Sequence, residues 1–177
     1  MKNHNEKSNI KLIPATQEDF IVVQNMFQYY VYDIASFVGR KMGWKLEENG
    51  LYELIPSLPL YWQEKERKPF LVRVNGELAG FVLMNKVGTT SQIDWTMGEF
   101  FIMRPYQRLG IGQYVAHLCF DQFLGNWEVM VLPGNEGAYQ FWLKTIKDYT
   151  QNHFSASFQK IAYKRNEERH VFQFTTK

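Results

Sequence analysis

The spacing of apolar residues along the chain alternates between two periods, and the changes divide it into strands and helices. Short continuous or alternating apolar runs indicate strands, whereas apolar residues three and four positions apart indicate helices. By this criterion we expect strands at 10–16, 69–74, 77–86, 98–103, 127–132, 153–163 and 169–176. The same criterion predicts helices at 18–37, 112–124 and 135–146.

Turn and cap signals support several of these boundaries. Asn75-Gly76 supplies the two positive φ values that a tight primed turn needs, so the strands on either side of it should form a hairpin. Thr16 followed by Asp19 resembles a helix start with an acidic group near the N-terminal dipole. Between about 39 and 62, glycines and prolines interrupt aromatic residues, and we expect a loop or short helices there.

The order and number of these elements predict an α/β fold in one domain, residues 1–177. The length of 177 residues is enough for one domain to bury a sizeable core, and there is no internal repeat or linker. Hydrophobic residues make up 45% of the chain and glycine and proline are scattered singly, which excludes disordered, collagen-like and low-complexity classes.

Charge and composition exclude several partners. The net charge of +2 arises from 20 basic and 18 acidic residues without a long basic stripe, so we expect no nucleic-acid partner. Cys119 is the single cysteine, which excludes an internal disulfide and predicts a buried helical thiol. We expect no metal, because no metal-ligand spacing relates the histidines His4, His117, His153 and His170. No run approaches the ~20 apolar residues of a membrane span, so we expect a cytoplasmic protein with no membrane partner.

The segment "QRLGIG", residues 107–112, places two glycines where a strand meets a helix. Glycines there let the backbone turn sharply and expose several N–H groups, and the helix start adds a partial positive charge. Such a junction suits a phosphate or pyrophosphate, and Arg108 could add a full charge. A P-loop would need Gly-Lys-Ser/Thr, and the dinucleotide fingerprint needs a third glycine where Val115 stands, so neither motif fits.

The same segment matches the pattern Gln/Arg-x-x-Gly-x-Gly/Ala, and the chain thereby resembles the GNAT superfamily of N-acetyltransferases. A second stretch, "VLPGNEGAYQFW" at 131–142, resembles the family's second signature, in which an Asn begins the helix after a strand. The resemblance extends from about residue 10 to residue 175. It implies a mixed, mostly antiparallel central sheet of about seven strands flanked by helices, with acetyl-CoA as co-substrate.

The resemblance also implies which residues bind that co-substrate. Backbone N–H groups of the glycine loop would hold the pyrophosphate, the end of the preceding strand would pair with the pantetheine amides, and Asn135 would lie near the thioester. Asn also favours the N-cap position, and both roles can hold at once. The implied cofactor-binding residues are Ile102, Met103, Arg104, Gln107, Arg108, Leu109, Gly110, Ile111, Gly112, Gln113, Asn135 and Trp142.

Acetyl transfer to an amine needs a base, because the ammonium of a lysine-like acceptor has a reference pKa of about 10.4. Glu99, at the start of the strand that should reach the thioester, is our candidate, with Asp94 as a weaker alternative. Trp142 stands where the family often has a tyrosine acid that protonates the CoA thiolate, and indole is not a proton donor of that kind. Tyr139, one turn earlier, could replace it, although we favour a core role for this ring, and the thiolate could also leave without an acid.

Aromatic residues and a carboxylate on the first helix suit a cationic acceptor. In the resembling fold this helix borders the acceptor cleft, so we expect Tyr29, Tyr30 and Asp33 to bind the acceptor. The sequence therefore predicts an N-acetyltransferase that acts by direct attack in a ternary complex on a small-molecule amine or a protein amino group. The alternative is an acetyl-CoA-binding sensor or inactive relative. The sequence leaves the acceptor and the oligomeric state open, a homodimer included.

Overall fold

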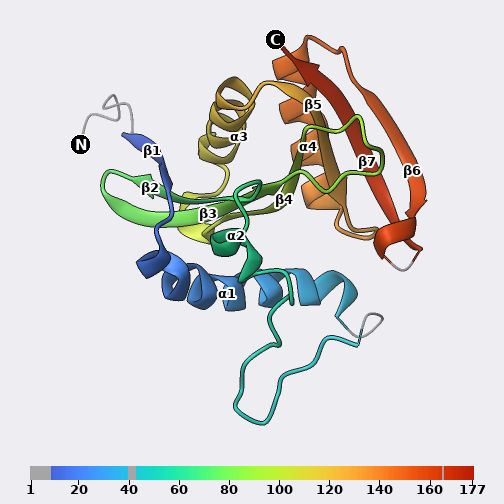
Figure 1. Ribbon diagram of the computed structural model, residues 1–177. Coiled ribbons are helices and arrows are strands. Elements are labelled where there is room, and N and C mark those ends of the chain that lie inside the picture. Colours follow the sequence, from blue (N-terminus) through green and yellow to red (C-terminus); the bar gives the residue numbers. More distant parts are fainter. Residues whose placement is uncertain (1–8, 40–42, 165) are drawn as a thin grey trace.

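The computed structural model of the protein describes residues 9–39, 43–164 and 166–177. His4, considered above as a metal ligand, lies outside this range. Seven strands form one sheet in the order β1-β2-β3-β4-β5-β7-β6 (Figure 1). Their bounds are β1 Ile10–Pro14, β2 Lys68–Val74, β3 Glu77–Asn85, β4 Trp95–Ile102, β5 Gly125–Val131, β6 Ser155–Ile161 and β7 Glu167–Thr176. All neighbours run antiparallel except β4 and β5, which are parallel.

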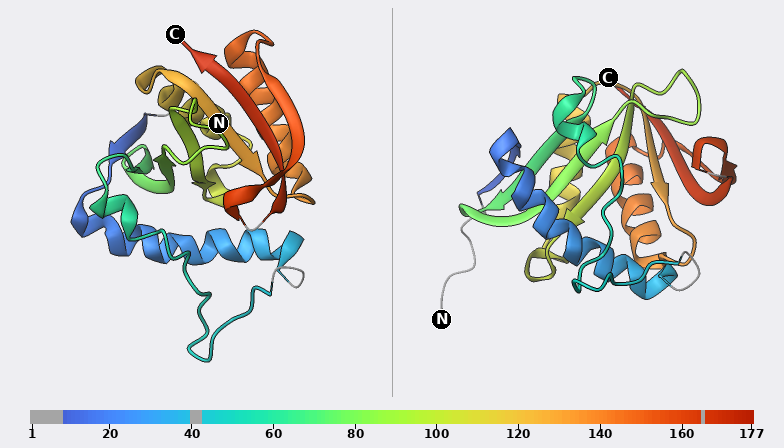
Figure 2. Two further views of the ribbon diagram at one scale, coloured as in Figure 1. Left: turned by 45° about the vertical axis from the view of Figure 1, so that its right-hand side comes forward. Right: turned by 60° about the horizontal axis from the view of Figure 1, so that its bottom comes forward.

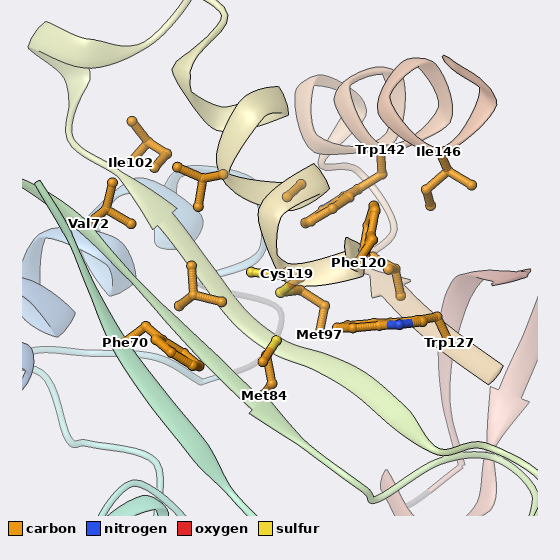
Figure 3. Close-up of a cluster of buried hydrophobic side chains, with 14 of the residues drawn as sticks. Phe70, Val72, Met84, Met97, Ile102, Cys119, Phe120, Trp127, Trp142 and Ile146 are labelled. Atoms are coloured by element: carbon orange, nitrogen blue, oxygen red, sulfur yellow. The ribbon is translucent and has the colours of Figure 1, made fainter. Parts of the chain in front are cut away.

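Helices cover both faces of this sheet (Figures 1 and 2). Helix α1, Phe20–Val38, and the short α2, Leu60–Gln63, pack on one face, and α3, Ile111–Gln122, and α4, Glu136–Thr150, pack on the other. Two hydrophobic clusters result, one on each face. The cluster under α3 and α4 includes Phe120, Trp127, Trp142 and the buried thiol of Cys119 (Figure 3). The mixed, mostly antiparallel sheet and the buried cysteine confirm the predictions from sequence.

The feature that positions the site is the divergence of β4 from β5 (Figure 2). The two strands pair only where Trp95–Met97 meets Trp127–Val129. Beyond this point β4 follows β3 to Ile102 while β5 follows β7. Gly98 is an extra residue in β4, because Leu83 pairs with Glu99 and the next β3 residue pairs with Met97. A bulge of this kind bends a strand, and it lies where the gap opens.

Several elements begin or end at residues other than those predicted from the sequence. β4 begins at Trp95 rather than 98, since its first three residues pair with β5. α4 continues to Thr150 rather than 146, and Gln151 ends it in the left-handed conformation. The irregular segment contains α2 and an isolated bridge between Leu46 and Tyr52. In the described part of the chain, no helix combines the length and the apolar character that crossing a bilayer requires.

Candidate active site

The glycine loop begins α3 as the sequence predicted. After β4, the short turn η2, Arg104–Tyr106, leads into the exposed residues 107–110. Arg108 and Gly110 adopt positive φ values of 61° and 78°, and the Tyr114 N–H bonds back to the Gly110 carbonyl at 3.0 Å. The first N–H groups of a helix have no intrahelical acceptor, so those of Ile111, Gly112 and Gln113 are directed at the loop.

The space around this loop suits a phosphate group. A Cβ added to Gly110 would meet no heavy atom within 4 Å, so the backbone lies open on that side. A Cβ on Gly112 would approach the Phe141 ring to 3.2 Å, so a side chain there would require the ring to shift by a few tenths of an ångström. The Gln113 side chain turns away and donates to Asp148 at 2.8 Å. An anion at this position would be bound by backbone N–H groups and the helix dipole.

The edge of β4 that faces the gap offers further backbone groups. The Phe101 carbonyl points at Gly80 of β3, and the Met103 N–H bonds to Ala79 O at 2.8 Å. Because peptide groups alternate in direction along a strand, those of Phe100 and Ile102 face the gap instead. The Ile102 carbonyl accepts from Gln107 Nε2 at 2.7 Å. The amide of Met103, expected to pair with a ligand, is therefore already bonded to β3.

A narrow slot of about 120 Å³ passes through the gap between β4 and β5. Asn135 lies at its rim, where its side chain caps α4 by accepting from the Ala138 N–H at 3.1 Å. Trp142 also lines the slot but is only 5% exposed, with its ring centroid 5.1 Å from that of Phe100. The remaining lining residues are Tyr30, Ile34, Met97, Gly98, Phe100, Val129, Met130, Val131, Leu132 and Ala138.

A broad cleft of about 830 Å³ lies on the α1 side of the sheet. Its walls come from α1, from the segment 43–57, from Tyr163 and Lys164 in the turn after β6, and from Arg169 of β7. Aromatic residues and charges of both signs line it, among them Trp44, Tyr52, Tyr61, Glu99, Lys164 and Arg169. Six residues line both cavities, so the slot and the cleft meet at Tyr30, Ile34, Met97, Gly98, Met130 and Leu132.

Glu99 lies on the cleft side of β4, next to this meeting point. Tyr30 from α1 donates a hydrogen bond to Glu99 Oε2 at 2.5 Å. Burial raises the pKa of Glu99, while the Tyr30 hydrogen bond and the charges of Lys164 and Arg169 act in the opposite direction. A carboxyl group with a raised pKa and access to a cleft is the usual arrangement of a general base.

Tyr61 and Asn85 form a second polar pair beside Glu99, which the sequence analysis missed. Asn85 Nδ2 donates to the Tyr61 hydroxyl at 2.7 Å, and burial followed by the Glu99 charge raises the pKa of Tyr61 to about 12. A Cβ on Gly98 would lie 2.3 Å from that hydroxyl, so the glycine of the bulge admits Tyr61 to the cleft. The only sequence signal was a glycine inside a strand, which often marks a bulge or a close approach.

Other predicted site residues lie elsewhere. Tyr139 packs against His170 and Phe172 of β7, with ring centroids 4.7 and 5.3 Å away, and lines neither cavity. Tyr29 is 59% exposed, and Asp33 binds Arg104 at 2.8 Å, which ties α1 to the end of β4. The weaker base candidate, Asp94, accepts from the Asn126 N–H at 2.8 Å, at the closed end of the β4–β5 pair. The structure thus brings together Tyr30 and Glu99, and not Tyr139 or Asp94.

A glycine loop at a helix start on one face of the sheet, a gap between two strands and a carboxyl-lined cleft on the other face are together the arrangement expected of an acyl-CoA-dependent acyltransferase. The chain matches the Acetyltransferase (GNAT) family over residues 33–146 and belongs to that family. No curated protein matches it in sequence. Family membership confirms the predicted acyltransferase activity with acetyl-CoA as co-substrate.

Solved structures support the fold. An acetyltransferase from Thermus thermophilus superimposes with a TM-score of 0.64 at 13% identity, covering 94% of this chain and 96% of that one. The ribosomal-protein-S18-alanine N-acetyltransferase of Escherichia coli gives 0.56 at 14% identity, covering 94% of each chain. A Bacillus anthracis str. Ames protein designated a streptothricin acetyltransferase, in complex with acetyl coenzyme A, gives a TM-score of 0.50 at 12% identity. The superposition covers 99% of this chain and 92% of that one.

Proposed function

We propose that this chain is an N-acetyltransferase that moves the acetyl group of acetyl-CoA to a primary amine bound in the cleft, by direct attack in a ternary complex. The observation that carries the proposal is the position of Glu99. Its carboxyl group lies in the cleft, next to the six residues that this cleft shares with the slot. An amine in the cleft and a thioester in the slot would therefore meet beside a base.

The cofactor is assigned to the loop and the slot. Acetyl-CoA supplies an activated acetyl group on a thiol that can leave. The N–H groups at the start of α3 would bind its pyrophosphate, and the peptide groups of Phe100 together with the N–H of Ile102 would pair with its pantetheine arm. Asn135 and Trp142 would border the thioester.

The chain's own residues then act on the amine. Glu99 would take a proton from the attacking nitrogen, directly or through water, as that nitrogen bonds to the acetyl carbon. A backbone N–H on the open edge of β4 would stabilise the oxyanion that forms in the transition state. The walls of the cleft and slot would hold the two reacting groups in the geometry of attack.

A small-molecule amine is the acceptor class that the cleft favours. Its volume of about 830 Å³ lies within the roughly 300–1,000 Å³ of small-molecule sites. Aromatic rings and the carboxyl of Glu99 would bind a cationic amine. The acceptors named for two of the solved structures, a ribosomal protein and streptothricin, are the comparison classes for a test.

The test is a screen of many amines in which turnover is measured by the release of free CoA thiol. Glu99→Gln is the variant. We expect at least one small amine to support turnover, and Glu99→Gln to lower it about 10²-fold or more with acetyl-CoA affinity preserved. Unchanged turnover in the variant would remove Glu99 from the reaction. Binding of acetyl-CoA without turnover of any amine or peptide would instead favour the sensor alternative, which the replacement of a tyrosine by Trp142 keeps open.

A further inference from the structure

Helix α4 does not present an acid to the slot. Trp142 occupies the slot wall, and its indole N–H does not exchange a proton in the way that a phenol does. Tyr139 points at β7 instead. Among the described residues that line the slot, Tyr30 is the one whose side chain carries an ionisable proton.

Tyr30 reaches this position from the opposite face of the sheet. Its ring is held in the cluster beneath α1, with centroids 5.2 Å from Phe27, 5.8 Å from Phe81 and 5.7 Å from Phe101. The residue lines both the slot and the cleft, and its hydroxyl donates to Glu99. One hydrogen bond therefore connects the proposed base in the cleft with a phenol that borders the slot.

We propose that Tyr30 is the catalytic acid, which protonates the sulfur of the departing CoA and regains its proton from Glu99. This inference rests on the proposed function, and it assigns to α1 a role that the sequence led us to seek on α4. The amine proton would enter on the cleft side of β4 and leave on the slot side, through two side chains already in contact.

The step balances as follows. The acceptor enters the step as the neutral amine, after its ammonium has lost one proton to water. The amine nitrogen forms a bond to the acetyl carbon, the carbon–sulfur bond breaks, and its electron pair stays on sulfur. One N–H proton passes to Glu99, the Tyr30 O–H proton passes to sulfur, and the Glu99 proton passes to the Tyr30 oxygen. An amide and free CoA thiol result, and both side chains return to their initial states.

The charges around the pair set the order of these transfers. Burial, then the charge of Glu99 and the hydrogen bond to it, raise the pKa of Tyr30 well above its ordinary value. Once Glu99 is protonated, the last two causes disappear and the phenol becomes a stronger acid. Three other ionisable groups act on the pair: Tyr61 of α2, Lys164 at the end of the short helix η3 (Ala162–Lys164), and Arg169 of β7.

The first test measures binding without turnover. Calorimetry at about pH 9, where a thiol with a reference pKa near 8.5 is largely ionised, compares CoA with desulfo-CoA. A hydrogen bond from Tyr30 to the thiolate predicts that the wild type prefers CoA about tenfold. Tyr30→Phe, which keeps the ring, should lose this preference. Tyr32→Phe, 67% exposed on the same helix, is the matched control and should keep it.

A Glu99→Gln background separates a direct role from an indirect one. If Tyr30 contacts the sulfur, Tyr30→Phe lowers the preference for CoA in this background too. If the loss appears only when Glu99 is present, Tyr30 acts through the carboxylate and the acid assignment is wrong. Equal preference in the wild type and Tyr30→Phe overturns the assignment directly.

Turnover supplies the second readout. With the best amine, Tyr30→Phe should lose about 10²-fold or more in kcat with little change in KM for acetyl-CoA, while Tyr32→Phe matches the wild type. Full activity in Tyr30→Phe refutes the acid role and leaves the proposed function standing. Failure of the wild type to turn over any amine refutes the proposed function, whereas the binding comparison still decides whether Tyr30 contacts the sulfur.

Discussion

The glycine loop allows a comparison between two alanine substitutions of equal backbone cost. Gly110 and Gly50 both have φ +78°, and a Cβ at either would meet no heavy atom within 4 Å. Gly110 begins α3, whereas Gly50 lies in an exposed turn closed by its N–H bond to Glu47 O at 2.8 Å. Gly110→Ala and Gly50→Ala therefore introduce nearly the same backbone strain, but only Gly110→Ala places a methyl group at the start of α3.

The magnitudes follow from this geometry. A Cβ in the left-handed region costs about 1–2 kcal/mol, and the smaller entropy of the unfolded alanine chain returns about 0.4–1 kcal/mol. We expect each variant to lose about 0.5–1 kcal/mol, or roughly 1–4 °C in Tm for a domain of this size. At Gly110 alone the new methyl occupies the space assigned to a phosphate, and loss of one charge-assisted hydrogen bond weakens acetyl-CoA binding about 10–100-fold.

The assay is thermal unfolding with and without acetyl-CoA, at a fixed concentration about 100 times the wild-type Kd. At that concentration the ligand stabilises the wild type by about 2.7 kcal/mol, a rise of roughly 5–11 °C. A tenfold weaker Kd reduces the gain to about 1.4 kcal/mol and a hundredfold weaker one to about 0.4 kcal/mol. The rise should thus fall to half or less in Gly110→Ala and remain complete in Gly50→Ala. An equal rise in both variants would refute the assignment of the loop to the pyrophosphate.

Three further outcomes are expected. Gly98→Ala should lose about 1–3 kcal/mol in urea unfolding, because its Cβ would lie 2.3 Å from the Tyr61 hydroxyl; an unchanged m-value with a lower midpoint would show that only stability changed. Tyr139→Phe should change turnover and stability little, since the ring packs on β7, and a loss of about 10²-fold in turnover would contradict that placement. Burial raises the pKa of Glu99, so its contribution to stability is complete below the unfolded-state pKa and is lost as pH rises through the folded value. The unfolding free energy of Glu99→Gln minus that of the wild type should therefore increase as pH rises from the unfolded-state pKa to the folded-state pKa of Glu99, and then level off. A difference that does not depend on pH would contradict the raised pKa.

Short-range signals in the sequence predicted most of the architecture. Asn75 and Gly76 do adopt the positive φ values of a hairpin turn, and Gly110 begins α3 in the left-handed conformation. Asn135 caps α4 through the Ala138 N–H, and Asp19 accepts from the Thr16 N–H at 2.8 Å. Each of these features depends on a few consecutive residues, and hence on local backbone sterics and hydrogen bonding.

The tertiary structure decided which side chains meet. Tyr30 and Glu99 are 69 residues apart in sequence, and their hydrogen bond exists because α1 packs across β4. Alternation along β4 placed Glu99 and Phe101 on one face, but only the packing of α1 showed that this face borders the cleft. The gap depends on where the parallel pairing of β4 with β5 stops, which periodicity within one strand cannot express. Local patterns thus determined the elements, whereas the site arose from contacts between elements distant in the sequence.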